Sequence, residues 1–252
     1  MKTITFASIK GGVLKTSSSI SLAQILSEKY KVLLVDCDSN NAATSHFIED
    51  IEVINNKTIR QVLKGDTEIK NAITEVSPNL FLLPSEIELS LIERELMGVS
   101  NQMFLLVDAL REVENDFDFC IIDTGPSLLF TTKLAMISSD IVVIPTQLEK
   151  WAVRAINGTF IELEDSRKAQ KYVDKKISKI VILPTQYEKN RTVKSVFLEL
   201  LKKQFSEYLS NSVIHMASEA SKTFSVLGDK LAINSRTYIE YKGFIEEILG
   251  VK

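Results

Sequence analysis

Six short, mostly apolar runs recur along this chain, and longer segments with helical periodicity separate them. Runs of four to six residues without alternating polar positions are typical of strands that are buried on both faces, as in a parallel sheet. Repeated strand–helix units predict an α/β fold, a doubly wound, mostly parallel sheet with helices on both faces. The expected strands are 4–7, 32–35, 80–83, 117–122, 141–144 and 180–183, and the expected helices are 86–97, 100–115, 149–169, 191–209 and 235–249, with one more that carries Ile20, Ala23 and Leu26.

No linker, repeat or shift in composition divides the 252 residues, so we expect one domain over residues 1–252. With 45% apolar residues, the composition is that of a globular protein. Cys37 and Cys120 lie in apolar runs and match neither a disulfide framework nor a zinc pattern. No apolar stretch reaches the roughly 18 residues that span a bilayer, and the first one meets Lys10 too early for a signal peptide. We therefore expect a cytoplasmic protein.

Prolines mark where most of the expected strands end. Pro84, Pro145 and Pro184 directly follow strand runs, and proline stops a strand because it cannot donate to the ladder. Ligands of open α/β sheets bind outside the carboxyl ends of the strands. The polar residues just beyond those ends are therefore the candidate functional residues: Asp36, Asp38, Asp123, Thr146 and Thr185.

A pair of glycines directly follows the first expected strand, in a chain with only nine glycines. In residues 9–17 (Ile-Lys-Gly-Gly-Val-Leu-Lys-Thr-Ser) a glycine turn lets backbone N–H groups face an anion, and the following helix adds the positive end of its dipole. Lys15 is placed to reach the β- and γ-phosphates of a nucleotide, and the Thr16 hydroxyl to bind Mg²⁺. A tight turn without a ligand is the alternative, but Lys-Thr after the Gly-Gly turn favours a phosphate site.

Five segments resemble motifs of the ParA/MinD/Soj ATPases, in the same order. Lys-Gly-Gly-x-x-Lys-Thr-Ser at residues 10–17 resembles their deviant Walker A motif, the phosphate loop of this class of P-loop NTPase. Residues 36–40 (Asp-Cys-Asp-Ser-Asn) look like switch I, and residues 121–126 (Ile-Ile-Asp-Thr-Gly-Pro) look like Walker B with switch II. Residues 145–152 and Ser218-Glu219-Ala220 are similar to two later segments of the partition branch. The resemblance covers nearly the whole chain.

The resemblance implies a role for each matching residue in an ATPase that uses ATP and Mg²⁺. Lys10 would be the signature lysine that reaches the partner's phosphates in an ATP-dependent, face-to-face homodimer. Lys15 would bind the β- and γ-phosphates of its own subunit, Asp38 would orient the attacking water, and Asp36 and Asp123 would hold Mg²⁺ through water. The implied catalytic residues are Lys10, Lys15 and Asp38; the nucleotide-binding residues are Gly11, Gly12, Val13, Leu14, Lys15, Thr16, Ser17 and Thr185; and the metal-binding residues are Thr16, Asp36 and Asp123.

Leu14 is the main departure from the family pattern, which has glycine just before the catalytic lysine. A left-handed backbone costs a non-glycine residue roughly 1–2 kcal/mol, which would weaken nucleotide binding about ten- to thirtyfold. Ser39, Asn40 and Gly125 also depart from the pattern, and Gly125 is expected to loosen switch II. Two interpretations stay open: a partition ATPase with weakened ATP binding, and an adaptor or regulator that kept the fold but lost ATP. A Rossmann dehydrogenase is disfavoured, because Gly-x-Gly-x-x-Gly is missing.

Positive charge gathers between residues 167 and 203, where eleven basic residues accompany three acidic ones in a chain of net charge −3. Such a run is either a solvated face or a polyanion-binding face. The resemblance implies nonspecific DNA binding, which depends on phosphate contacts, and a centromere-binding partner protein. With DNA bound, the protein would be associated with the nucleoid. The arginine that often precedes the Ser-Glu-Ala segment is absent, since Met216 and Ala217 stand there.

The chain end and the remaining side chains exclude other branches and sites. Residues 246–252 are acidic and look like a final core helix, unlike the basic membrane helix of the MinD branch, so no membrane partner is expected. Cys37 lies between the switch I aspartates, which excludes the cluster-binding nitrogenase iron proteins. His46 and His215 lack partners at metal-ligand spacing. The aromatic residues expected in the core are Trp151, Phe117, Phe119, Phe130, Phe160 and Phe224.

Overall fold

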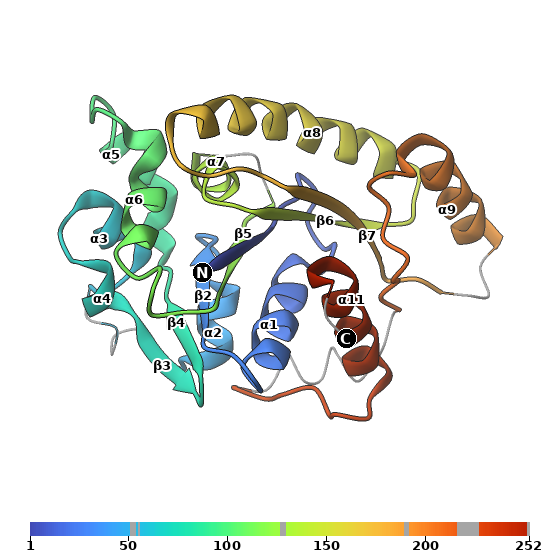
Figure 1. Cartoon of the computed structure of the whole chain (residues 1–252), viewed down its shortest axis with the longest axis horizontal. Helices are drawn as coiled ribbons and strands as arrows, with labels where there is room; N and C mark the ends of the chain where they lie inside the picture. Colours follow the sequence, from blue (N-terminus) through green and yellow to red (C-terminus); the bar gives the residue numbers. More distant parts are fainter. Residues whose placement is uncertain (51–53, 55, 127–129, 189–191, 216–226, 251–252) are drawn as a thin grey trace.

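A twisted sheet with strand order β3-β4-β2-β5-β1-β6-β7 runs through the centre of the molecule (Figure 1). The computed structural model describes residues 1–50, 54, 56–126, 130–188, 192–215 and 227–250. Within these residues β3 is antiparallel to its neighbour β4, and all the other pairs are parallel. The strands are β1 (Lys2–Phe6), β2 (Val32–Cys37), β3 (Thr74–Ser77), β4 (Leu80–Leu83), β5 (Phe119–Thr124), β6 (Ile141–Gln147) and β7 (Lys179–Thr185).

Helices cover both faces of this sheet. One face is covered by α1 (Lys15–Leu26), α2 (Ala42–Phe47) and α11 (Arg236–Leu249), and Figure 1 shows α1 and α11 side by side. The helices of the opposite face are α3 (Ile59–Lys64), α4 (Ile69–Ala72), α5 (Ile92–Glu95), α6 (Leu105–Arg111), α7 (Phe130–Ile137), α8 (Ala152–Ala169) and α9 (Thr192–Phe205). Short 3₁₀ turns are η2 (Ile87–Leu91), η3 (Gln102–Phe104) and η4 (Gln170–Tyr172). The doubly wound α/β class is therefore confirmed.

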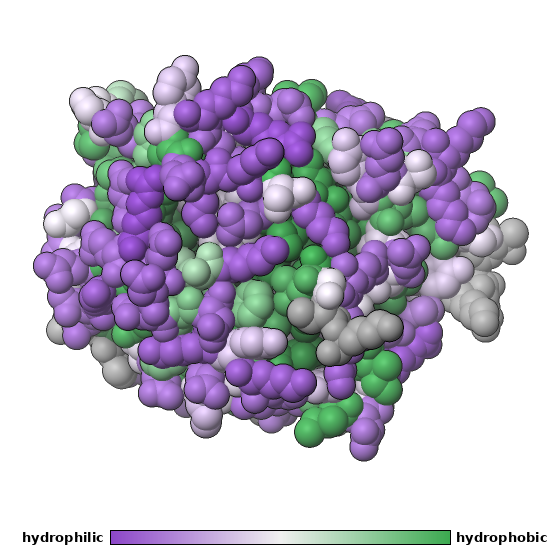
Figure 2. Space-filling model, viewed as in Figure 1, coloured by the Kyte–Doolittle hydropathy of each residue, from purple (hydrophilic) through white to green (hydrophobic). Residues whose placement is uncertain are grey.

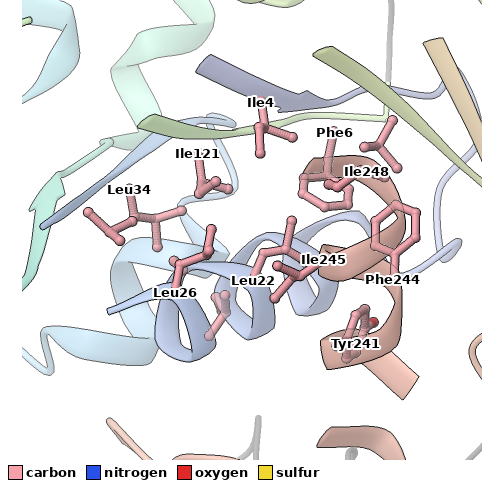
Figure 3. Packing of buried hydrophobic residues seen from close by; sticks show 14 of the residues in the cluster. Ile4, Phe6, Leu22, Leu26, Leu34, Ile121, Tyr241, Phe244, Ile245 and Ile248 are labelled. Atoms are coloured by element: carbon pink, nitrogen blue, oxygen red, sulfur yellow. The ribbon is translucent and has the colours of Figure 1, made fainter. Parts of the chain in front are cut away.

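Successive residues of the central strands enter different cores. In β2, Val32 and Leu34 pack on the side of α1 and α11, whereas Leu33 and Val35 pack on the side of α3 and α6. Figure 3 shows the first of these cores, in which strand side chains meet those of α1 and α11. Because both faces are buried, a strand needs an apolar residue at every position, and this explains the unbroken apolar runs.

All six expected strands form, but two of the prolines do not end their strands, so that expectation is wrong. Pro145 lies inside β6 and Pro184 inside β7. Pro145 comes after Val143, which forms the last pair of β6 with β1. The Pro184 carbonyl faces away from β6 and accepts a hydrogen bond from the Ile214 N–H (2.9 Å). Neither position needs a donor in the ladder, and proline is tolerated there.

Several elements differ from the expected pattern. β3 is a half-exposed edge strand of polar sequence, and it lacks the apolar run that identified the others. The expected helix 86–97 is divided into η2 and α5, and the expected helix 100–115 into η3 and a shorter α6. The segment Ser218-Glu219-Ala220 and Phe224 lie outside the described residues. No helix among the described residues is long and apolar enough to cross a membrane.

Candidate nucleotide-binding site

The loop between β1 and α1 turns through two left-handed residues. Gly12 has φ 72°, and Leu14, the residue before α1, has φ 66° and ψ 31°. The left-handed backbone expected at Leu14 is therefore present. The Leu14 side chain is half-buried and packs against the core that α1 and α11 share. Its carbonyl accepts the first helical hydrogen bond, from the Ser18 N–H (2.9 Å), so the strained residue still starts the helix.

Lys15 lies inside the curve of this loop. Its side chain is buried, and its Nζ donates to the carbonyls of Ser8 (3.2 Å) and Lys10 (3.0 Å). Burial lowers the pKa of Lys15, and the carboxylates of Asp123 and Asp38 oppose that shift. The ammonium group therefore joins two carbonyls of the loop and holds it closed.

Asp36 of β2 and Asp123 of β5 are neighbours in the sheet, and both are fully buried. Burial raises the pKa of each carboxyl group. The charge of Asp36 raises the pKa of Asp123 further, and the charges of Asp36 and Asp123 add to the effect of burial in raising the pKa of Cys37. Asp36 accepts hydrogen bonds from the Asp38 N–H (3.0 Å) and from the N–H and hydroxyl of Thr44 (both 2.8 Å). Asp123 Oδ1 accepts one from the Ser19 hydroxyl (3.1 Å).

The second oxygen of Asp123, Oδ2, is buried and has no hydrogen-bond partner within the described residues. An unpaired buried carboxylate oxygen is costly unless a cation or water compensates it. Thr16, in the first turn of α1, interacts with the Asp123 carboxyl and lowers its pKa. These residues therefore fit Mg²⁺. Because no three acidic, His or Cys side chains of the described chain form a direct cage, the ion would keep several of its waters, as Mg²⁺ usually does.

Asp38 lies at the rim of this buried pair, on the loop after β2. Its Oδ1 accepts hydrogen bonds from the N–H and the side-chain amide of Asn40 (3.0 and 3.1 Å), and its carbonyl accepts one from the Ser85 hydroxyl (2.8 Å). A Cβ atom at Gly125 would lie 3.0 Å from Asp38 Oδ1. Gly125 therefore leaves room for the Asp38 carboxylate. A cavity of about 50 Å³ between Asp38, Gly125 and Phe130 has room for water.

Lys10 lies on the other side of the loop, outside the curve that holds Lys15. Its Nζ donates to Gln147 Oε1 (3.0 Å) and forms an ion pair with Glu149, so the end of β6 holds the half-exposed side chain. Trp151 follows in the same segment and is 56% exposed, which corrects its expected place in the core. It stands directly before the first residue of α8.

The two threonines expected at strand ends have different surroundings. The Thr185 hydroxyl donates to the Val13 carbonyl (3.1 Å), which places Thr185 against the phosphate loop. The Thr146 hydroxyl donates to the carbonyl of Ile144 in its own strand (3.2 Å) and makes no contact with the loop that would assign it a role. Gly11 is an exposed residue of the same loop, and Ser17 is a half-buried residue in the first turn of α1.

Four further residues belong to the site and were missed in the sequence. They are Ser19, Thr44, Ser85 and Gln186, which bond Asp123, Asp36, the Asp38 carbonyl and the Gly12 carbonyl. Ser85 comes two residues after the end of β4 and Gln186 directly after the end of β7, so their position was a usable signal. Ser19 and Thr44 lie on helices, where only the tertiary structure shows which carboxylate they meet.

The basic segment 167–203 does not form one continuous face. Residues 167–176 form the last turn of α8 and the segment after it, whereas Lys202 and Lys203 lie on α9, which Figure 1 shows near the opposite end of α8. Figure 2 shows a mostly hydrophilic surface on the visible side of both regions. Within the described part of this segment, four ion pairs join cations to carboxylates: Arg167 with Glu164, Lys168 with Asp165, Lys175 with Asp140, and Lys202 with Glu199.

Comparison with known proteins gives consistent matches. A family model described as an AAA domain matches residues 1–179. The sporulation initiation inhibitor protein Soj of Bacillus subtilis is 32% identical over 216 residues, which are 84% of this chain and 83% of that protein. A putative plasmid partition protein of Borrelia burgdorferi bound to AMPPNP is 32% identical, with a TM-score of 0.84 over 99% of this chain and 98% of that one. Cobyrinic acid a,c-diamide synthase of Mycobacterium smegmatis, with an ATP analogue and magnesium, is 26% identical, with a TM-score of 0.81 over 99% and 94% of the two chains.

Proposed function

The chain belongs to the ParA/MinD family and is a ParA-like partition ATPase, and from this premise we propose how it works. It binds MgATP at the carboxyl end of β1, dimerises face to face around the nucleotides, binds DNA without sequence specificity, and hydrolyses ATP slowly. A centromere-binding protein is its partner in the segregation of a plasmid or chromosome. The names of the Soj and plasmid partition relatives support this role.

The buried pair Asp36–Asp123 beside Lys15 is the observation that carries the proposal. Bound Mg²⁺ would neutralise charge on the phosphates and the carboxylates. With nucleotide and ion bound, Lys15 would contact the β- and γ-phosphates, Thr16 would contribute its hydroxyl to the ion, and Asp36 and Asp123 would hold the ion's waters. The relatives bound to AMPPNP, and to an ATP analogue with magnesium, support nucleotide and Mg²⁺ binding in this fold.

Asp38 is the residue that we assign to the attacking water. Its carboxylate lies at the rim of the buried pair and beside the 50 Å³ cavity, while its neighbour Asn40 fixes the orientation of Oδ1. A carboxylate that orients water in this way contributes positioning, which is the main requirement of phosphoryl transfer. Gly125 supports the role, because a larger residue there would press on the carboxylate.

The conformation of Leu14 bears on the choice between the two interpretations that the sequence leaves open, an ATPase and an adaptor without ATP. Its side chain packs against the α1–α11 core, so the cost of the leucine is backbone strain of roughly 1–2 kcal/mol. Strain of that size weakens binding but does not abolish it. This packing supports retained ATP binding.

Calorimetric titration with MgATP tests the proposal directly. Wild type is expected to bind MgATP, and Lys15→Ala to lose measurable binding, because it removes the cation that meets the phosphates. Lys70→Ala, an exposed lysine on α4, serves as the control. Wild type that binds no MgATP at millimolar concentration would overturn the ATPase proposal and favour the adaptor.

DNA binding is tested with the exposed cations that form no ion pair among the described residues. Charge reversal of Lys171, Lys176 and Lys203 is expected to weaken binding equally across DNA sequences and to lower the salt dependence by up to about one unit of slope per lysine. Lys175 is left intact, because its Nζ holds Asp140. If wild type with MgATP does not bind DNA at low salt, the basic segment is only a solvated face.

A further inference from the structure

Two consecutive carbonyls of the phosphate loop are held by two consecutive residues at the end of β7. The Gly12 carbonyl accepts a hydrogen bond from Gln186 Nε2 (2.7 Å), and the Val13 carbonyl accepts one from the Thr185 hydroxyl (3.1 Å). These bonds connect residues more than 170 positions apart in the sequence. The end of β7 therefore acts on the backbone of the loop itself.

The geometry of the peptide bond gives these contacts a consequence. In a planar trans peptide the carbonyl and the following N–H point in opposite directions. The Gly12 carbonyl shares its peptide with the Val13 N–H, and the Val13 carbonyl shares its peptide with the Leu14 N–H. With both carbonyls turned towards β7, both N–H groups are turned away from it, and N–H groups aligned in this way form an anion-binding nest.

Gln186 is itself held in place. Its backbone is left-handed, with φ 52°, and its Oε1 accepts a hydrogen bond from Gln147 Nε2 (2.8 Å). Gln147 Oε1 in turn accepts from Lys10 Nζ (3.0 Å). A chain of hydrogen bonds thus runs from Lys10 through two side-chain amides back to Gly12. A side-chain amide donates at its nitrogen and accepts at its oxygen, so each glutamine can serve both neighbours.

We propose that Gln186, with Thr185, is a positioning residue that keeps the Val13 and Leu14 N–H groups directed at the nucleotide phosphates although Leu14 replaces the usual glycine. The left-handed backbone of Leu14 is unfavourable, and the two hydrogen bonds from β7 offset that strain. The proposal rests on nucleotide binding at this loop. Gln186 would act by holding the backbone of the loop and need not contact the phosphates itself.

The test compares Gln186→Ala with Gln204→Ala, a matched change at an exposed glutamine of α9. Loss of one neutral hydrogen bond is expected to weaken MgATP binding about three- to tenfold, as measured by calorimetry. In ¹⁵N-labelled protein without nucleotide, the amide resonances of Val13 and Leu14 are expected to move in Gln186→Ala and to stay in place in Gln204→Ala.

A double-mutant cycle with Leu14→Gly separates positioning from general stability. Glycine adopts the left-handed backbone without strain, so Gln186→Ala should reduce MgATP affinity by a smaller factor in the Leu14→Gly background. Equal factors in both backgrounds, or unmoved amide resonances, overturn the proposal. If wild type binds no MgATP, the proposed function fails, and the amide resonances alone decide whether Gln186 positions the loop.

Discussion

The two sides of the phosphate loop are stabilised in opposite ways. On the β2–β5 side, Asp36 and Asp123 are fully buried neighbours, and Asp123 Oδ2 lacks a partner among the described residues. On the β6–β7 side, Lys10, Gln147 and Gln186 are half-buried and joined to one another by hydrogen bonds. On the first side, the buried carboxylates destabilise the fold until a cation binds. On the second side, the polar groups already have hydrogen-bond partners within the chain.

This difference assigns separate tasks to the two sides. Buried carboxylates gain most from a bound metal ion, because water cannot compensate them. Half-exposed hydrogen bonds are exchanged for others at low cost, because water or a new partner replaces them. The metal site should therefore depend on the β2–β5 side, whereas the β6–β7 side should govern the shape of the phosphate loop through Gln186 and the rearrangement of Lys10 during self-association.

The largest expected effect is the loss of self-association in Lys10→Ala. Lys10 lies outside the curve that holds Lys15, so the variant should bind MgATP within about threefold of wild type. It should nevertheless form no ATP-dependent dimer, because the cation that would reach the partner's phosphates is gone. Light scattering with MgATP measures the dimer, with Lys70→Ala as control. Equal dimer formation by variant and wild type would show that the β6–β7 side plays no part in association.

Leu14→Gly is expected to raise MgATP affinity by about ten- to thirtyfold, because glycine relieves roughly 1–2 kcal/mol of left-handed strain. Turnover should rise as well. Asn101→Gly provides the control, since Asn101 also has a left-handed backbone (φ 60°) but lies at the start of η3. Unchanged affinity in Leu14→Gly would mean that the loop accommodates leucine without strain, and that the hydrogen bonds from β7 have no strain to offset.

Asp123→Asn should stabilise the nucleotide-free protein at pH 8. Burial raises the pKa of Asp123, so the folded protein keeps a proton that the unfolded chain loses near pH 4. That contribution to the free energy of unfolding is full below about pH 4 and is lost as pH rises through the raised pKa. Asparagine removes the cost of the charged form, and the unfolding midpoint should rise by about 2–4 °C for each kcal/mol removed.

The unfolding midpoints of wild type and Asp123→Asn should also differ in a defined way under two further conditions. At pH 5 the gain of Asp123→Asn over wild type should shrink, because wild type is then protonated to a greater extent. With MgATP the order should reverse, since wild type gains the metal site and the variant does not. Asp116→Asn, at an exposed position, should change neither midpoint. A variant less stable than wild type at pH 8 without nucleotide would contradict the view that the β2–β5 side is strained by its charges.

Much of the fold was predictable because its signals are local. An apolar run of four residues such as 32–35 is a strand signal in itself, and the Gly-Gly turn before Lys15 and Thr16 identifies the loop without its surroundings. The edge strand β3 was not predictable in this way, because one exposed face leaves a polar sequence. Pro145 and Pro184 misled for a related reason. A proline is compatible with a strand where no ladder partner needs its N–H, either beyond the last pair with β1, as for Pro145, or on the outer side of the last strand, as for Pro184, and the sequence does not show where those places are.

The order of residues along the chain is enough to predict which chemical groups reach the carboxyl edge of the sheet. Lys10, Lys15, Asp36, Asp38 and Asp123 all follow from their distance to the end of a strand. Which of these groups come into contact depends on the strand order, which the sequence does not reveal. Strand order makes Asp36 and Asp123 neighbours, and the end of β6 gives Lys10 its partners. The end of β7 brings Gln186 to the Gly12 carbonyl. The physical reason is that periodicity and turn chemistry act over a few residues, whereas strand order joins residues that are far apart in the chain.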